Sequence, residues 1–154
     1  RDRLAAVRDP SNPNVQWINH ELSGSRGASG PSREADSLFA SLARAPATHL
    51  PPGDAPRFEL AYGKYLARVG RDAEAEKHLL LAEAGLRAPR ESNMRRRMQV
   101  LDALVELEQA WGTRTPSAAR AAALARWTAT RDAEAPELRK AIEEGRVPRE
   151  GAGR

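Results

Sequence analysis

The chain has 154 residues, enough for one ordinary domain, and its 40% hydrophobic and 30% charged residues are typical of a globular protein with a modest core. It contains no cysteine, which excludes disulfides and thiolate metal sites, and no apolar run approaches the ~20 residues that a membrane-spanning helix needs. The net charge is +4, and 22 of the 25 basic residues are arginine, a bias that we attribute mainly to the codon usage of a GC-rich genome.

The start of the chain indicates its context. No signal peptide is visible, and the absence of cysteine gives no sign of an oxidising compartment, so we expect a cytoplasmic protein. Because the chain begins at Arg1 without an initiator methionine, we also expect it to be a fragment of a longer protein.

Apolar side chains recur at the spacing of amphipathic helices along most of the chain. We expect helices over about residues 14–22, 32–44, 54–69, 72–86, 92–110 and 116–130, and a short terminal helix over 136–144 before a frayed tail. A Gly- and Ser-rich loop separates the first two, and a Pro-rich connection precedes the third, which we expect to end at Gly70. The fourth begins with several acids, which the helix dipole favours in that position.

The same spacing predicts which side chains face the core. In the third and fourth helices these are Phe58, Ala61, Tyr62, Tyr65, Leu66, Ala75, Leu79 and Ala82. In the fifth helix, which we expect Gly112 to end, they are Met94, Met98, Leu101, Leu104 (or Val105), Leu107 and Trp111. In the sixth, which should begin after Thr115-Pro116 and fade by Thr130, they are Ala119, Ala122, Leu124 and Trp127.

The predicted helices come in pairs, and the spacing between pairs repeats. Gly30, Gly70 and Gly112 each close the first helix of a pair, at offsets of 40 and 42 residues. A period of this length built from helix–turn–helix units is typical of a helical solenoid. We therefore predict an all-α fold in which Gly and Ala let paired helices approach closely.

The central pair carries a recognisable pattern, made of Tyr62, Gly63, Leu66, Gly70, Ala75, Leu79 and Ala82. This pattern resembles the tetratricopeptide repeat (TPR), with small residues at Gly63, Ala75 and Ala82. The stretch from Val105 to Trp127 is similar to the terminal repeats of large bacterial multidomain proteins, which often carry a Ser/Thr protein kinase domain ahead of their repeats.

The resemblance implies a helical-hairpin solenoid with a right-handed superhelix over residues 1–130. Its three repeats would cover about residues 13–45, 54–88 and 91–130, and a short helix and frayed tail would occupy 131–154. It also implies a bacterial protein whose parent chain contributes further repeats or a kinase domain. Glu108 departs from the family pattern, which normally has a bulky aromatic residue there.

The sequence shows no set of residues that predicts catalysis, so we do not expect an enzyme. Carboxylates occur close together as Glu74 with Glu76 and as Glu106 with Glu108. Residues two apart on a helix do not face each other, whereas acid–base catalysis needs two groups that converge on one substrate. We interpret these acids as solvated side chains or as acids near a helix N-terminus.

We expect neither a metal nor a cofactor. The three histidines, His20, His49 and His78, fall in three different predicted elements. A metal-binding helix would instead show ligands at set spacings, such as two histidines four residues apart. We also interpret Met94, Met98 and Trp111 as core residues and not as a ligand box.

Arg95, Arg96 and Arg97 form the sharpest basic cluster, and we expect them to fan across the solvent side of the fifth helix. Exposed guanidinium groups suit phosphate contacts, so nucleic-acid binding by this Arg-rich face is the alternative function. No interleaved aromatic residues accompany the cluster and no known nucleic-acid-binding motif fits, so we rank this alternative second.

The resemblance implies a protein-binding scaffold in which the first helix of each pair lines a concave groove. Carried onto this chain, the groove residues would be Arg57, Leu60, Lys64, Arg68, Gln99, Asp102, Glu106 and Gln109. The groove would be basic at one end and acidic at the other. We therefore expect the partner to be an extended or helical protein segment of mixed charge, bound weakly, and not a membrane. A spacer between other domains is the remaining possibility.

Overall fold

The computed structural model describes residues 37, 39, 54–88 and 90–149. These residues form four long helices and contain no strand: α4 (Asp54–Arg68), α5 (Asp72–Gly85), α6 (Glu91–Arg114) and α7 (Ala118–Glu143). Ser37 and Phe39 are helical as well. The all-α class is thus confirmed for the described residues. The predicted helix over 14–22, Gly30, and most of the first repeat with its second helix over 32–44 lie outside the described residues.

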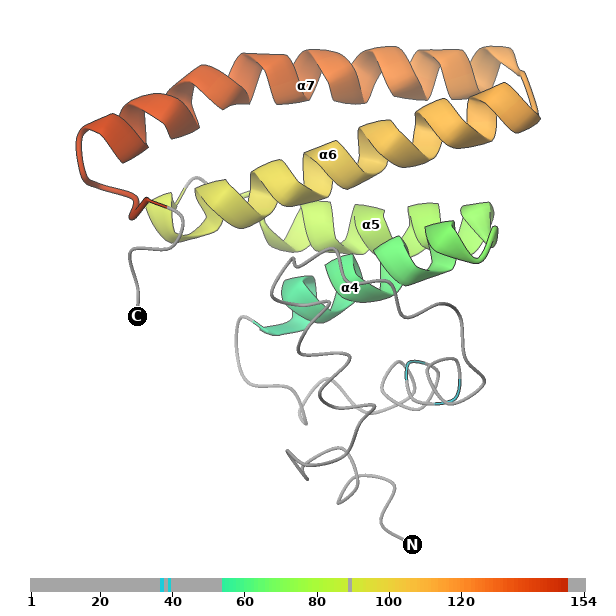
Figure 1. Cartoon of the computed structure of the whole chain (residues 1–154), viewed down its shortest axis with the longest axis horizontal. Helices are drawn as coiled ribbons and strands as arrows, with labels where there is room; N and C mark the ends of the chain where they lie inside the picture. The colour runs from blue at the N-terminus through green and yellow to red at the C-terminus, as the bar shows by residue number, and fades with distance from the viewer. Residues whose placement is uncertain (1–36, 38, 40–53, 89, 150–154) are drawn as a thin grey trace, which may run out of the picture.

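The four helices follow one another as antiparallel neighbours (Figure 1). α4 packs along α5 and α6 packs along α7, so each pair forms a helical hairpin. The two hairpins meet where α5 packs on α6, and α4 also touches α6. In Figure 1 the helices lie one above another in chain order, from α4 at the bottom to α7 at the top.

The turn between α4 and α5 forms as the sequence predicts. Gly70 has a φ of +81°, in the left-handed region that an L side chain rarely adopts. Its N–H donates to the carbonyl of Ala67 at 3.2 Å, and the N–H of Arg71 donates to the carbonyl of Leu66 at 2.9 Å. This pair of bonds is a Schellman motif, which satisfies the last carbonyls of α4. Asp72 can therefore begin α5 at once.

The core joins the two hairpins into one hydrophobic cluster. All eight apolar residues predicted for the core faces of α4 and α5 are buried, and so are Leu101, Leu104 and Leu107 of α6 and Trp127 of α7. Phe39 adds an aromatic ring that stacks on Tyr62 and Tyr65 at centroid distances of 5.0 and 5.1 Å. The prediction for the start of α7 is wrong, because Ala119 and Ala122 are exposed.

Two predicted helix ends are also wrong. Gly112 does not end α6, which continues to Arg114, where the guanidinium binds Asp72 of α5 at 2.6 Å. Likewise α7 does not fade at Thr130 but continues through Pro136 to Glu143 as one helix of 26 residues. An interior proline costs about 3 kcal/mol in a helix. Packing on both sides of it offsets this cost, since Trp127 and Ala141 are both buried.

Candidate functional site

The predicted groove residues of α6 form one exposed stripe. Gln99, Asp102, Glu106 and Gln109 are all exposed and follow one another at intervals of three or four residues, so they share a face of the helix. Asp102 lies 3.8 Å from the guanidinium of Arg131 on α7, a loose surface ion pair. The stripe therefore remains open to a partner over most of its length.

The predicted groove residues of α4 are less uniform. Arg68 is exposed, Arg57 and Lys64 are half-buried, and Leu60 is buried in the hydrophobic cluster. Within the described part of the chain, Nε of Arg57 is buried without a hydrogen-bond partner. Because α4 touches α6, the two sets lie on neighbouring helices. Leu60, however, packs inside the protein and does not offer its side chain to an open groove.

The arginine cluster does not fan across the solvent side as the sequence predicted. Arg95, Arg96 and Arg97 are all half-buried. Arg95 donates to the carbonyl of Pro148, beyond the end of α7. Arg97 forms two parallel hydrogen bonds to Glu134 of α7, at 2.7 and 2.8 Å. The helix wheel places these residues opposite the core of α6, but α7 and the residues after it cover that side.

Arg97 belongs to an ion cluster that links three helices. Besides Glu134 it contacts Glu83 of α5 at 3.1 Å, and Arg87 binds the same Glu83 at 2.6 Å. Glu83 is only 5% exposed. Although its burial acts in the opposite direction, the hydrogen bonds from Arg87 and Arg97 hold the pKa of Glu83 below its usual value. Two carboxylates thus balance two guanidinium groups.

A second ion cluster links the same three helices about two turns away along α5. Nη1 of Arg120 in α7 lies 2.5 Å from Glu76 of α5 and 2.9 Å from Glu108 of α6. The guanidinium stacks on Trp111, 3.9 Å from the ring centroid. The interpretation of Glu76 and Glu108 as solvated acids is therefore wrong, because Glu108 is fully buried and Glu76 lies mostly inside the interface.

The pKa values of the two carboxyl groups in this cluster shift in opposite directions. Burial raises the pKa of Glu108 to about 7, the neighbouring Glu76 acts in the same sense, and Arg120 opposes them. For Glu76, burial opposes the shift, but hydrogen bonds from Glu108 and Arg120 lower its pKa. The pair therefore keeps one proton to a higher pH than an isolated glutamate does.

A spacing in the sequence could have revealed these buried acids. Asp72, Glu76, Leu79 and Glu83 follow at intervals of four, three and four residues, which places all four on one face of α5. Leu79 on that face is fully buried. Acids that share a helix face with a core leucine point into an interface, and their partners are then expected among arginines of other helices.

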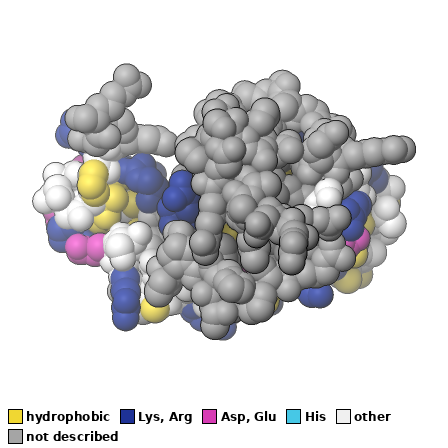
Figure 2. Space-filling model, turned by 90° about the horizontal axis from the view of Figure 1, so that it is seen from below, with side chains coloured by type: hydrophobic (Ala, Val, Ile, Leu, Met, Phe, Trp, Pro, Cys, Tyr) yellow, Lys and Arg dark blue, Asp and Glu magenta, His cyan; other side chains and the backbone are white. Residues whose placement is uncertain are grey.

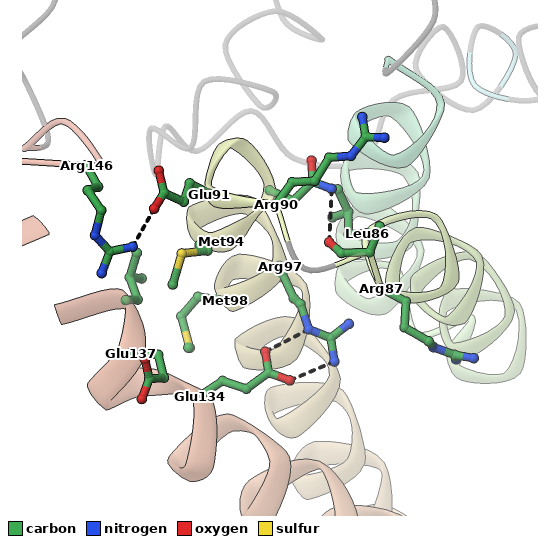
Figure 3. A pocket seen from close by; sticks show the side chains of 13 residues that line it. Leu86, Arg87, Arg90, Glu91, Met94, Arg97, Met98, Glu134, Glu137 and Arg146 are labelled. Atoms are coloured by element: carbon green, nitrogen blue, oxygen red, sulfur yellow. Dashed lines mark hydrogen bonds and ion pairs between the residues drawn. The ribbon is translucent and has the colours of Figure 1, made fainter. Parts of the chain in front are cut away.

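A cavity lies where the two hairpins meet, between the end of α5, the start of α6 and the second half of α7. Its volume is about 600 Å³, and Met94, Met98 and Leu138 give it an apolar floor. Figure 3 shows the two methionines side by side, with Arg97 and Glu134 paired next to them. The prediction that these methionines belong to the core is wrong, since both are half-buried and line this cavity.

His78 takes part in the packing of the first hairpin. Its Nδ1 contacts the carboxylate of Glu59, and its ring lies 4.4 Å from the ring of Tyr62, both on α4. Among the described residues, no group of three His, Cys, Asp or Glu side chains is arranged to hold a metal ion. None of the helices in that part of the chain is both long enough and apolar enough to cross a membrane.

Comparison of the chain with protein-family models, with curated proteins and with solved structures finds no match.

Proposed function

We propose that this chain is a protein-interaction scaffold whose helical hairpins stack as TPR-like repeats and bind a partner along their first helices. The observation that supports this most is the order of helix contacts. α4 and α6, the first helices of successive pairs, touch each other as well as their own second helices. First helices that lie next to one another offer a continuous surface to an extended or helical segment.

The charges on this surface suggest the kind of partner. Lys64 and Arg68 make the α4 side basic, while Asp102 and Glu106 make the α6 side acidic. A segment with acids at one end and bases at the other complements both sides. Because these side chains are at least partly exposed, each ion pair contributes about 1 kcal/mol or less, and we expect weak, salt-sensitive binding.

A charge reversal on α4 tests the groove. The double variant Lys64→Glu/Arg68→Glu should capture less of a protein partner that binds the wild type saturably in a pulldown. The matched control is Lys77→Glu/Arg139→Glu, which makes the same charge change at exposed positions on α5 and α7. Equal capture by the wild type and the α4 variant, with both folded by circular dichroism, would show that the partner does not use this surface.

Nucleic-acid binding by the Arg-rich face remains the second candidate. Its support is weaker because Arg95 and Arg97 already bind other parts of the chain. On the face seen in Figure 2, the basic side chains that are visible lie at several separate places. Binding to a mixed-sequence duplex that falls steeply with salt concentration, and is lost in Arg96→Glu, would favour this candidate over the scaffold.

The cellular context completes the proposal. A bacterial, cytoplasmic parent protein with further repeats or a kinase domain would give the scaffold a signalling role. The coding DNA upstream of Arg1 tests this directly. Kinase motifs or more repeats of about 42 residues would support it, and an unrelated domain would argue against it.

A further inference from the structure

The interface between the two hairpins contains two ion clusters, and only one of them has equal numbers of acidic and basic groups. In the cluster around Arg97, two carboxylates, Glu83 and Glu134, face two guanidinium groups, those of Arg97 and Arg87. In the cluster around Arg120, two carboxylates face one guanidinium. The first cluster is neutral with every group charged, whereas the second would carry one uncompensated negative charge.

Among the described residues, no cation other than Arg120 pairs with Glu76 or Glu108. The charged groups that face the fully buried Glu108 are Glu76 from α5 and Arg120 from α7. The next pair along the interface, Asp72 with Arg114, is neutral by itself. An uncompensated buried charge costs several kcal/mol, and a carboxyl group avoids this cost by keeping its proton.

We infer that Glu76, Glu108 and Arg120 form a proton-operated joint. One shared proton holds the end of the α4–α5 hairpin near the start of α5 against α6 and α7. Loss of this proton loosens the same end of the hairpin. The raised pKa of Glu108, about 7, places the transition near neutral pH. The joint acts within the fold and needs no bound partner, so it stands or falls separately from the proposed scaffold function.

The proton has a route to the joint that does not require unfolding. Glu108 and Arg120 both line a cavity of about 240 Å³ beside the α6–α7 connection. The cavity can hold waters beside Arg120, and because the Glu108 side chain is fully buried, a local movement must bring its carboxyl group to these waters before the proton is exchanged. Titration should therefore be fast and reversible.

Loss of the proton should act at one end of the interface only. With both carboxylates charged, Glu76 on α5 and Glu108 on α6 repel each other, and one guanidinium cannot neutralise both. The neutral cluster around Arg97 continues to hold the end of α5 against α6 and α7. The hairpins should then pivot about the Arg97 end and open at the Arg120 end.

A pair of distance measurements tests this asymmetry. Because the chain has no cysteine, two spin labels can be placed without background labelling. The test pair is Ala73→Cys with Ala119→Cys, on exposed positions beside the joint, and the control pair is Ala84→Cys with Ala133→Cys, near the Arg97 cluster. Double electron–electron resonance is recorded on the whole chain between pH 5.5 and 8.5.

We expect the test pair to give a longer and broader distance distribution above a midpoint near pH 7, while the control pair stays constant. Glu108→Gln keeps a neutral, hydrogen-bonding side chain at the site and should hold the test pair at its low-pH distance throughout. Should this variant fail to fold, Glu76→Gln removes the same excess charge from the less buried partner. The inference is overturned if the test pair does not respond to pH, or if its response survives in the folded Gln variant.

Discussion

The packing of α4 on α5 makes a sharp prediction about two glycines in helices. Gly63 lies in α4, where an added Cβ would sit 2.6 Å from Cγ and 2.7 Å from Cδ2 of Leu79 in α5. Gly112 lies in α6, where an added Cβ would meet only Cβ of Arg120, at the ordinary contact distance of 3.6 Å. Alanine at the two positions should therefore change stability in opposite directions.

The magnitudes follow from two opposing effects. Replacing glycine by alanine inside a helix stabilises by about 0.5–1 kcal/mol, because the unfolded chain loses freedom. At Gly112 this gain is unopposed, so we expect Gly112→Ala to stabilise by about that amount. At Gly63 the added methyl overpacks against Leu79, which is fully buried and cannot move aside, and overpacking costs about 1–3 kcal/mol. The expected net loss for Gly63→Ala is up to about 2 kcal/mol.

Urea unfolding followed by circular dichroism measures both variants. A double variant sharpens the result: Leu79→Ala alone should cost about 2–5 kcal/mol, but it makes room for the new methyl. Gly63→Ala should then lose its cost in the Leu79→Ala background, which gives a measurable coupling between the two positions. If Gly63→Ala stabilises as much as Gly112→Ala, α4 and α5 do not approach this closely and the packing argument fails. A loss at Gly112 would contradict its place inside α6.

Three further predictions concern the stability of the folded chain. Gly70→Ala should destabilise by about 1 kcal/mol in the same unfolding assay, because its backbone is left-handed. Arg97→Met should cost about 3 kcal/mol, because it removes one of the two guanidinium groups that hold the buried Glu83; an unchanged midpoint would show that Arg87 suffices. The pKa of Glu83 is lower in the folded chain than its ordinary value of 4.5, so its contribution is present above pH 4.5 and is lost as the pH falls further. Unfolding curves at pH 3 and 6 should therefore differ less in Glu83→Gln than in the wild type.

The pH dependence from Glu108 has the opposite sign. Its pKa is raised from 4.5 to about 7 on folding, so its contribution is complete below pH 4.5 and is lost as the pH rises to about 7. The lowered pKa of Glu76 partly offsets this, since the two carboxyl groups titrate as a pair. We expect a net loss of stability between pH 5 and 8 that Glu108→Gln removes. A flat profile in the wild type would contradict the burial of this carboxyl group.

Local signals in the sequence were sufficient for the first hairpin. Gly70 ends α4 because its left-handed backbone conformation depends only on neighbouring residues. The acids that follow favour the start of α5, and this effect too acts within one helical turn. Local signals failed in the second hairpin. Gly112 and Pro136 both look like helix breakers, yet the glycine costs about 1 kcal/mol and the proline about 3 kcal/mol, and packing between α6 and α7 outweighs these costs.

The candidate site divides in the same way. The stripe of α6 was chosen from the repeat resemblance, and its exposure agrees with helix periodicity, because residues opposite the apolar face of an amphipathic helix face solvent. The burial of Leu60 could not be predicted from helix periodicity. Whether a residue at the edge of an apolar face is buried depends on which helices lie beside it, and α4 has neighbours that its own sequence does not specify.

The sequence by itself determined the helical class, the turn at Gly70 and the apolar faces of α4 and α5, since each depends on interactions between residues a few positions apart. Only the tertiary structure decided that Glu108 is fully buried and that Arg97 pairs with Glu83 and Glu134 across the interface. A charged side chain looks the same in the sequence whether it faces water or an opposite charge. Its burial depends on a partner far away in the chain, and folding alone brings that partner within hydrogen-bonding distance.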